Sequence, residues 1–352
     1  MKLLHITATH LEKFGGIPAV LKNLIEEQNK IKDFEVRLLS IRVKKTGFES
    51  QYFNFLKDGE TFKEYIKGYQ PDIVIFHSFF YIEYVFVASY LIKNHIKYFI
   101  EPHGSFGIVA NKKSRIKKKI FYATIAKQLL KNTYGFIFLN KAEKESSIFR
   151  TENDLIIPNG VRCVTESGNK NDELSFYYIG RYDIKGKGLD VLLEALKILD
   201  KGKKRYKIDF YGTGTEKQKK YIKKKINDFS YLQVKELGSI YNKQKTEMLS
   251  KYHIMLLTSR HEGFPMSVLE AWSMGNPCII TKETNVAELL KTNGLGWETE
   301  ISVNSIANTI ERAVQDYLSN GSSYPDVCMK FVKDNFSWEM VARQSYDILS
   351  KC

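Results

Sequence analysis

The sequence predicts an α/β protein made of two doubly wound domains. Short apolar runs alternate with stretches of helical periodicity, which is the order expected when helices cover both faces of a parallel sheet. The alternation runs through the chain twice, and a length of 352 residues favours two domains over one. A polar, glycine-containing stretch over residues 164–174 lacks apolar periodicity and separates the two series. This stretch is the expected domain boundary.

The expected elements follow in chain order. In the first half we expect strands over 3–7, 73–76, 97–100, 136–139 and 154–157, and helices over 18–30, 81–93, 115–131 and 141–150. In the second half we expect strands over 176–179, 207–211, 232–235, 254–257 and 277–281, and helices over 189–199, 216–227, 266–274 and 286–290. The resulting domains are 1–165 and 166–335. A terminal helix follows over 336–352, and the pattern leaves its packing partner open, a return to the first domain being one option.

The composition is that of a folded protein with a strong basic bias. Hydrophobic residues make up 43% and charged residues 27%, which excludes a wholly disordered chain or a collagen. The formal net charge is +14, and it is uneven: nine Lys and Arg residues and no acidic residue lie between Glu101 and Glu143. Such a local basic window predicts an acidic partner, which leaves nucleic acid, an anionic membrane and a phosphorylated substrate as candidates.

Cysteine usage and hydropathy favour a soluble or peripheral protein in a reducing compartment. The four cysteines form no CxxC pair, and no Cys/His pair has zinc spacing, so we expect neither a disulfide framework nor a metal. The first apolar stretch is too short for a signal peptide. The most apolar window, residues 73–92, contains His77, Ser78 and Glu83, and therefore indicates a strand, a loop and a helix rather than a membrane span.

Two glycine-rich turns are candidate anion sites. Gly15 and Gly16 follow the first expected strand and precede Pro18, so the backbone there can approach a phosphate at a helix N-terminus. A plain strand-to-helix turn explains this pattern equally well. Gly212 and Gly214 likewise follow a strand, and taken alone they favour a tight turn over a ligand site.

Basic side chains follow the first strand of the second series. Arg181 and Lys187 lie in the loop after that strand, at the carboxyl edge where open α/β sheets bind ligands. Arg offers two-pronged contacts to a phosphate and Lys offers a point charge. A solvated basic loop is the alternative, and it is the stronger interpretation for Lys185.

The sharpest signal is the loop and helix over residues 259–270. Gly263 and Pro265 shape a loop after a strand, and a helix is expected to begin near Met266 with free N–H groups at the same sheet edge. Glu262 precedes this helix and Glu270 lies one turn into it, so their carboxylates could accept hydrogen bonds from hydroxyl groups. A capped helix with surface glutamates is the alternative. His103, after another strand and before Gly104, is a further candidate site residue.

Taken together, these motifs resemble the retaining glycosyltransferases of the GT-B fold, family 4 (glycosyl transferases group 1), over most of the chain. Glu262 and Glu270 have that family's Glu-x7-Glu spacing, and Gly180-Arg181 followed by Lys187-Gly188-Leu189-Asp190 is also typical of it. The Gly-Gly, His-Gly and Gly-x-Gly pairs occur in the family's order. The resemblance implies two Rossmann-like domains facing a cleft, with the acceptor bound by the first domain and a nucleotide-sugar donor by the second.

The resemblance also implies a role for each candidate residue. Arg181 and Lys187 would neutralise the donor diphosphate, Gly16 would donate a backbone N–H to it, and Glu270 would hold the ribose. Glu262 would contact the transferred sugar, and His103 the sugar or the reacting centre. The remaining donor contacts would come from Gly15, Gly212, Ile240, Gly263, Phe264, Pro265, Met266 and Ser267. The Arg181–Lys187 spacing is one residue longer than the family's commonest form, so Lys185 could share the role of Lys187.

The implied activity is transfer of a hexose from a nucleotide-diphosphate sugar, UDP-sugar by default, with retention of configuration. No Asp-x-Asp occurs in the chain, so we expect neither a metal nor another cofactor. The implied acceptor is a lipid-linked oligosaccharide or polysaccharide of cell-surface glycans such as capsule or O-antigen. An epimerase or phosphorylase of the same fold is an alternative. A nucleic-acid-binding protein is another, but it lacks a recognisable motif.

The basic window resembles that of enzymes acting on bacterial surface polysaccharides. We expect a cytoplasmic protein, with Lys112–Lys131 as a possible contact with an anionic membrane surface and with no nucleic acid as partner. Apolar residues recur there at helical spacing, and we expect most of them to be core: Ile116, Ile120, Phe121, Ile125, Leu129 and Leu130. The aromatic residues over 79–86 could be core or could lie on the acceptor face.

Overall fold

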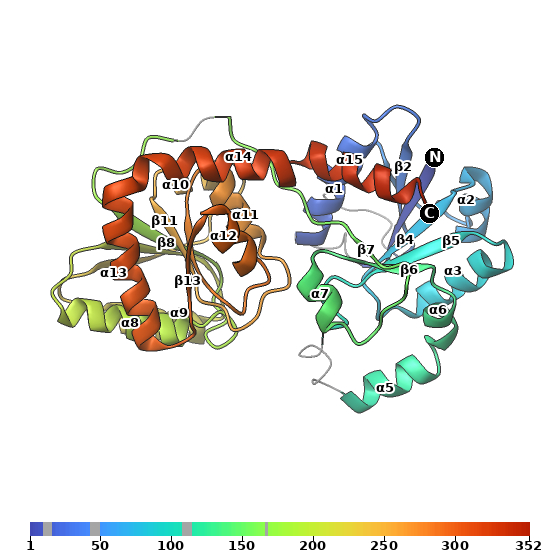
Figure 1. The fold of residues 1–352 in the computed structure, drawn as a ribbon. Coiled ribbons are helices and arrows are strands. Elements are labelled where there is room, and N and C mark those ends of the chain that lie inside the picture. The colour runs from blue at the N-terminus through green and yellow to red at the C-terminus, as the bar shows by residue number, and fades with distance from the viewer. Residues whose placement is uncertain (10–15, 43–49, 108–114, 166–167) are drawn as a thin grey trace. The chain divides into compact units, whose positions relative to one another are not determined.

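The chain folds into two compact units in the computed structural model, which describes residues 1–9, 16–42, 50–107, 115–165 and 168–352 (Figure 1). The first unit contains Met1–Gly160 together with Trp338–Cys352, and the second contains Val161–Ser337. The terminal helix over 338–349 therefore belongs to the first unit, although the whole second unit precedes it in the sequence.

The first unit is built on a seven-stranded parallel sheet with the order β3-β2-β1-β4-β5-β6-β7. Its strands are β1 (Lys2–Thr7), β2 (Glu35–Ser40), β3 (Phe53–Phe55), β4 (Ile73–His77), β5 (Lys97–Glu101), β6 (Gly135–Phe138) and β7 (Leu155–Ile156). Its helices are α1 (Gly16–Gln28), α2 (Phe62–Tyr69), α3 (Ile82–Lys93), α5 (Arg115–Ala123), α6 (Lys127–Lys131), α7 (Lys141–Ser146) and α15 (Trp338–Leu349).

Helices cover both faces of this sheet, as the continuous apolar strands require. On one face, Leu21 and Ile25 of α1 and Val341 of α15 pack with apolar residues of the strands into one core cluster. On the other face, apolar residues of α2, α3 and α6 form a second cluster with the strands. The terminal helix α15 thus completes the cover of the first face, where it lies against α1.

The second unit is built on a six-stranded parallel sheet with the order β10-β9-β8-β11-β12-β13. Its strands are β8 (Ser175–Arg181), β9 (Lys207–Thr213), β10 (Gln233–Gly238), β11 (Ile254–Leu257), β12 (Cys278–Thr281) and β13 (Gly296–Thr299). Its helices are α8 (Leu189–Lys201), α9 (Glu216–Ile226), α10 (Asn242–Leu249), α11 (Met266–Ser273), α12 (Ala287–Asn293), α13 (Val303–Asn320), the 3₁₀ turn η2 (Gly321–Ser323) and α14 (Tyr324–Phe336). One core cluster, which includes the fully buried Trp272, joins the sheet to its helices.

The predicted fold class is confirmed, with two doubly wound parallel sheets. The first six strands of each sheet have the order 3-2-1-4-5-6, which reverses between the first and fourth strands, and the first sheet adds a seventh strand at its edge. Some elements were not predicted: β2, β3, β13, α2, α10, α13 and α14. The missed strands are short, with six residues or fewer, whereas α2 and α13 have a clear apolar face that the sequence analysis did not use.

The expectation of one continuous helix over 115–131 is wrong. Two helices, α5 and α6, occupy this stretch, and a wide turn separates them in which the Ala126 N–H donates to the Phe121 carbonyl. Thr124 also donates its hydroxyl to the Ile120 carbonyl, a side-chain bond that competes with continued helix. The break lets the two helices take different directions.

Candidate active site

The loops that follow β8 and β11 meet where the strand order of the second sheet reverses. β8 and β11 are adjacent parallel strands, although they are the first and fourth strands of this sheet along the chain (Figure 1). Helices leave these two strands toward different sides of a doubly wound sheet, so a crevice forms at their carboxyl ends. Arg181 and Lys187 follow β8, and Glu262 follows β11.

The loop after β8 is held by hydrogen bonds within the loop. The Asp183 carboxylate accepts a hydrogen bond from the Gly186 N–H at 3.0 Å, and the Lys187 N–H donates to the Asp183 carbonyl. Gly188 has a φ of +65°, and a Cβ there would lie 1.9 Å from the carbonyl oxygen of Thr258. Only glycine allows so close an approach of this loop to the end of β11.

Lys187 and Glu262 form an ion pair across this reversal point. The Lys187 ammonium contacts Glu262 Oε1, and the Ser259 hydroxyl donates to the same oxygen at 2.6 Å. Both charged side chains are largely buried, so their charges are only partly screened by solvent. An anion entering this site would find a positive charge already held in place.

Lys185 is engaged elsewhere. Its ammonium contacts Asp190 at 2.8 Å and is largely exposed, while Arg260 makes a two-pronged contact with the same carboxylate at 2.8 and 3.0 Å. Although burial acts to raise it, these hydrogen bonds lower the pKa of Asp190 to about 2. The geometry therefore separates Lys185, on the outer side of the loop, from Lys187, on the side of Glu262. Arg181 is exposed at the end of β8.

The predicted start of α11 at Met266 is confirmed, and Pro265 immediately precedes it. Among the described residues no side chain caps this helix end, so its first N–H groups stay available to an anion. Glu270, one turn into α11, pairs with Lys245 of α10 at 2.5 Å, and both side chains are partly exposed. Sequence reasoning missed Lys245, because α10 carries no pattern that sets this lysine apart from its neighbours.

Two further predicted donor residues, Gly212 and Ile240, lie at the ends of β9 and β10. Gly212 packs so tightly that a Cβ there would lie 2.0 Å from the Gly180 carbonyl oxygen, which is a structural reason for glycine. The Ser239 hydroxyl donates to the Gly212 carbonyl at 3.2 Å, and half-buried Ile240 packs on the core. The structure thus brings Gly212 and Ile240 to the same sheet edge.

The first unit holds the other predicted site residues. Gly16 is the first residue of α1, and Gly15 lies outside the described residues. His103 follows β5 in a left-handed conformation with a φ of +47°, which is costly for a residue other than glycine. Gly104, with a φ of +78°, donates its N–H to the buried Glu143 carboxylate at 2.7 Å. Contacts on both sides thus hold this strained turn.

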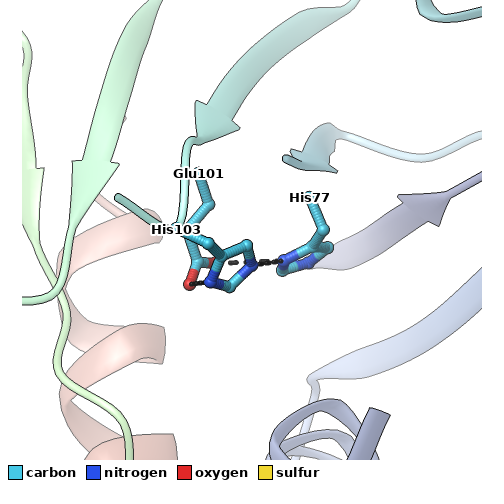
Figure 2. A group of neighbouring side chains, drawn as sticks. All are labelled: His77, Glu101 and His103. Carbon is cyan, nitrogen blue, oxygen red and sulfur yellow. Dashed lines mark hydrogen bonds and ion pairs between the residues drawn. The ribbon is translucent and has the colours of Figure 1, made fainter. Parts of the chain in front are cut away.

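His103 belongs to a cluster that the motifs did not reveal. Figure 2 shows His77 of β4 facing His103, with Glu101 of β5 beside both. His77 Nδ1 lies 3.0 Å from His103 Nε2, and His5 Nδ1 of β1 lies 2.7 Å from His77 Nε2. Strand register could have found this cluster: His77 pairs with Glu101, and His5 lies opposite Ile75, two residues before His77 on the same sheet face.

The two carboxyl oxygens of Glu101 lie 3.3 Å from His77 Nδ1 and 3.4 Å from His103 Nδ1. Burial raises the pKa of Glu101 to about 8, and the nearby Glu143 acts in the same direction. Burial lowers the pKa of His5 to about 4, while hydrogen bonding to Gln28 acts in the opposite direction. Burial thus favours the uncharged forms of Glu101 and His5 near neutral pH.

His77, Glu101 and His103 are close enough together for a metal ion to be considered. The arrangement fits a hydrogen-bonded chain better. His103 turns Nε2 toward His77 and Nδ1 toward Glu101, so its two nitrogens face different partners rather than one shared point. The expectation that the protein needs no metal remains a prediction.

The basic window contains α5, a basic helix with exposed apolar side chains. Ile116 and Ile120 of α5 are 76% and 58% exposed, and Ile125 is exposed as well, so the expectation that they are core is wrong. Phe121 and Leu130 are partly buried and Leu129 is buried, as expected. Figure 1 shows α5 at the edge of its unit, where the sheet does not cover its outer face. Lys112 and Lys113 lie outside the described residues.

Of the aromatic residues over 79–86, Phe79 and Tyr84 are core. Phe80 and Phe86 are exposed, and the Lys118 ammonium lies 4.9 Å from the centre of the Phe80 ring. The surface formed by Phe80, Ile116, Lys118 and Ile120 thus combines apolar and basic groups. Within the described ranges, no helix has the length and apolar character needed to cross a bilayer.

Comparison with known proteins agrees with this geometry. Residues 164–327 match the family described as Glycosyl transferases group 1. One of the subunits of human (Homo sapiens) phosphatidylinositol N-acetylglucosaminyltransferase is 25% identical over 71% of this chain and 51% of its own length. Lipopolysaccharide 1,6-galactosyltransferase of Escherichia coli K12 is 29% identical over 61% of this chain and 57% of its own length. The chain thus aligns with a little over half of each of these relatives.

The fold has close structural counterparts. HepE from Anabaena, crystallised in complex with UDP, matches with a TM-score of 0.74 at 16% identity, and the match covers 100% of both chains. At that level of identity the likeness shows the fold, which is GT-B.

Proposed function

Because its second unit belongs to the glycosyl transferases group 1, we propose that this glycosyltransferase uses a nucleotide-diphosphate sugar and retains the configuration of the transferred sugar. The observation that carries the proposal is the meeting of Lys187, Glu262 and the uncapped N-terminus of α11 at the reversal point of the second sheet. A diphosphate needs positive charge and N–H donors, and a sugar needs hydrogen-bond acceptors. The carboxyl edge of the second sheet offers both the positive charge with N–H donors and the acceptors.

Each residue keeps the role that the resemblance implies. Arg181 and Lys187 neutralise the diphosphate as it leaves, Glu270 holds the ribose, and Glu262 holds the transferred sugar. The N–H groups of Phe264 and its neighbours line the diphosphate. His103 contacts the sugar or the reacting centre. Positioning and charge stabilisation account for the rate without a protein nucleophile, and the basic side chains take the place of a metal.

UDP is the proposed nucleotide, since HepE, which shares the fold, was crystallised with UDP. A lipid-linked or polysaccharide acceptor is proposed because one relative is named as a lipopolysaccharide galactosyltransferase. The exposed isoleucines of α5, together with Lys117, Lys118 and Lys119, support a contact with an anionic membrane at the cytoplasmic face. Each lysine near such a surface contributes about 1 kcal/mol.

A thermal-shift series tests the donor assignment. UDP and UDP-sugars should raise the melting temperature, because a ligand that binds only the folded state stabilises it. GDP and ADP serve as competitors for the base, and the Lys187→Ala variant should lose the shift. Transfer to an acceptor should persist in a chelator. A wild-type protein that no nucleoside diphosphate stabilises at millimolar concentration would refute the proposal.

A further inference from the structure

The end of β11 holds the backbone on both sides of Lys187. The Thr258 hydroxyl lies 3.3 Å from the carbonyl oxygens of Lys187 and Gly188, so its hydrogen is shared between them. The Arg260 N–H donates to the Gly186 carbonyl at 2.9 Å. Because the proposed function uses the ammonium of Lys187, contacts that fix its backbone also determine where that ammonium lies.

The side chain of Arg260 contacts the same loop at two further points. Its Nη1 donates to the Lys185 carbonyl, and its guanidinium makes the two-pronged contact with Asp190 at 2.8 and 3.0 Å. Lys185 precedes Lys187 by two residues, and Asp190 follows it by three, in the first turn of α8. One side chain therefore connects the two ends of the segment that carries Lys187.

This segment needs a connection to the rest of the unit. Lys187 stands between Gly186 and Gly188, and glycine gives the free chain more conformations than any other residue. The hydrogen bonds within the loop join residues only a few positions apart, such as the Gly186 N–H and the Asp183 carboxylate. They shape the loop, but they do not fix where it lies relative to β11. The contacts of Arg260 supply that connection.

The end of β11 also fixes the partner of the Lys187 ammonium. Ser259, the residue before Arg260, donates its hydroxyl to Glu262 Oε1 at 2.6 Å, and its carbonyl accepts from the Thr281 hydroxyl at 2.6 Å. Oε1 of Glu262 is also the atom that contacts the Lys187 ammonium. The same short segment thus holds the backbone of Lys187 and the carboxylate that faces its side chain.

A role in folding stability alone does not account for Arg260. Asp190 lies in the first turn of α8, where a carboxylate is favourable without a basic partner. The Arg260 side chain is 38% exposed, and ion pairs with such exposure contribute little to the stability of the fold. Substitution of Arg260 should therefore leave the protein folded and change the position of the loop.

We propose that Arg260 is a positioning residue that clamps the loop between β8 and α8 against the end of β11, and thereby holds the Lys187 ammonium beside Glu262 for the donor diphosphate. The inference rests on the proposed function for the diphosphate, and on the contacts of Arg260 for the clamp. Arg260 acts through Lys187 in this scheme and does not itself touch the donor.

Hydrogen–deuterium exchange of the whole chain observes the clamp without an activity assay. In Arg260→Met, amide exchange over residues 182–188 should become at least about tenfold faster, because opening the loop no longer breaks hydrogen bonds to a charged group. Arg343→Met is the matched control, since it removes an exposed arginine that pairs with Glu339 on α15, and it should leave this exchange unchanged. Unchanged exchange in Arg260→Met would overturn the inference.

Steady-state kinetics test the link to Lys187. Arg260→Met should lower kcat about 10- to 100-fold, because a displaced ammonium stabilises the leaving diphosphate poorly. Arg260→Lys keeps the charge but cannot make the two-pronged contact, so most of the loss should remain. In a Lys187→Ala background, Arg260→Met should lower kcat little further, since the two residues act as a unit. Melting temperatures show whether each variant is folded.

The possible failures are distinguishable. Faster loop exchange in Arg260→Met, in a protein whose wild type turns over no nucleotide sugar, would refute the proposed function and leave the clamp intact. Equal losses from Arg260→Met with and without Lys187, or full activity of Arg260→Lys, would refute the inference and leave the proposed function intact.

Discussion

The two units hold the side chains around their candidate site residues in opposite electrostatic states. In the second unit the acidic side chains are paired with basic ones, Lys187 with Glu262 and Lys245 with Glu270, and these pairs are partly open to solvent. In the first unit Glu101, His77 and His5 are buried, and burial shifts the pKa values of Glu101 and His5 toward their neutral forms. The second unit therefore holds charged side chains in ion pairs, whereas burial in the first unit favours uncharged side chains.

This difference matches what each site is proposed to bind. A diphosphate carries charge, so its site needs fixed cations, and a carboxylate partner keeps such a cation compensated while the ligand is absent. A sugar hydroxyl is neutral and is recognised by the direction of a hydrogen bond, which a buried neutral network fixes better than a solvated ion. The predictions below test whether the two sites depend on charge and on proton position in this way.

The largest effect is expected from the charge at the reversal point. Lys187→Ala should lower kcat about 100- to 1,000-fold, because the leaving diphosphate loses a fixed cation and Glu262 loses its partner. Lys185→Ala is the matched control, since that lysine contacts Asp190 at the exposed side of the same loop, and its effect should stay within a few-fold. Steady-state transfer kinetics measure both. Equal losses in the two variants would show that net basic charge, rather than the position of Lys187, matters.

Glu270 should affect donor binding more than chemistry. Glu270→Ala should raise the donor KM about 10- to 100-fold, the range for a lost hydrogen bond to a charged group. Lys245→Ala breaks the same ion pair but leaves the carboxylate, so its KM should change only a few-fold. Glu288→Ala, exposed on α12, controls for loss of an acidic surface residue. If Lys245→Ala raised the donor KM as much as Glu270→Ala, the loss of the ion pair, rather than of a ribose contact, would explain the weaker donor binding.

The sequence predicts more of the candidate site residues in the second unit than in the first. Lys187, Gly188 and Glu262 lie in loops directly after strands, and parallel strands bring such loops to one edge, so order along the chain was enough. The first unit's cluster around His103 depends instead on side chains inside strands. His5 looks like an ordinary member of β1 until the register of β1 and β4 is known.

Solvent exposure was the other quantity that could not be predicted. Helical spacing in α5 suits a buried stripe, yet Ile116 and Ile120 are exposed, because the break after α5 separates them from buried Leu129. The sequence predicts which side of a helix is apolar. It does not predict whether another element lies there to cover it, since that depends on distant parts of the chain.

The exposed isoleucines distinguish α5 from α9, a lysine-rich helix of the second unit. The apolar Ile222 of α9 is buried, so the exposed side chains of α9 are all charged. The double variant Ile116→Ser, Ile120→Ser should weaken binding to vesicles containing anionic lipid at least about tenfold, since full burial of one such side chain is worth roughly 1.5–3 kcal/mol. Replacing Lys220 and Lys224 of α9 by Ser should change binding little. Vesicle co-sedimentation in low salt measures both, and equal losses would remove α5 as the membrane contact.

The smallest effect should come from the protonation of Glu101, which His77, His103 and Glu143 face. With a pKa near 8, Glu101 ionises as the pH rises past that value, and its carboxylate then places a negative charge beside the His103 ring. Activity should therefore fall about tenfold at one pH unit above 8. Glu101→Gln keeps an N–H donor toward the rings, so it should remain active and lose this decline.

Ionisation of Glu101 should also change the free energy of unfolding, and the direction of the change follows from proton linkage. An ordinary glutamate ionises near pH 4.5, so between about 4.5 and 8 the unfolded chain binds fewer protons at this position than the folded one. Glu101 therefore lowers the free energy of unfolding as the pH rises through that window, and the loss levels off above it. Glu101→Gln should flatten the fall in melting temperature between pH 6.5 and 8, above the window in which His5 titrates. Glu145→Gln, exposed on α7, should leave the slope unchanged. An unaltered slope in Glu101→Gln would mean that Glu101 is ionised in the folded protein, and the neutral state assigned to the first unit would fail with it.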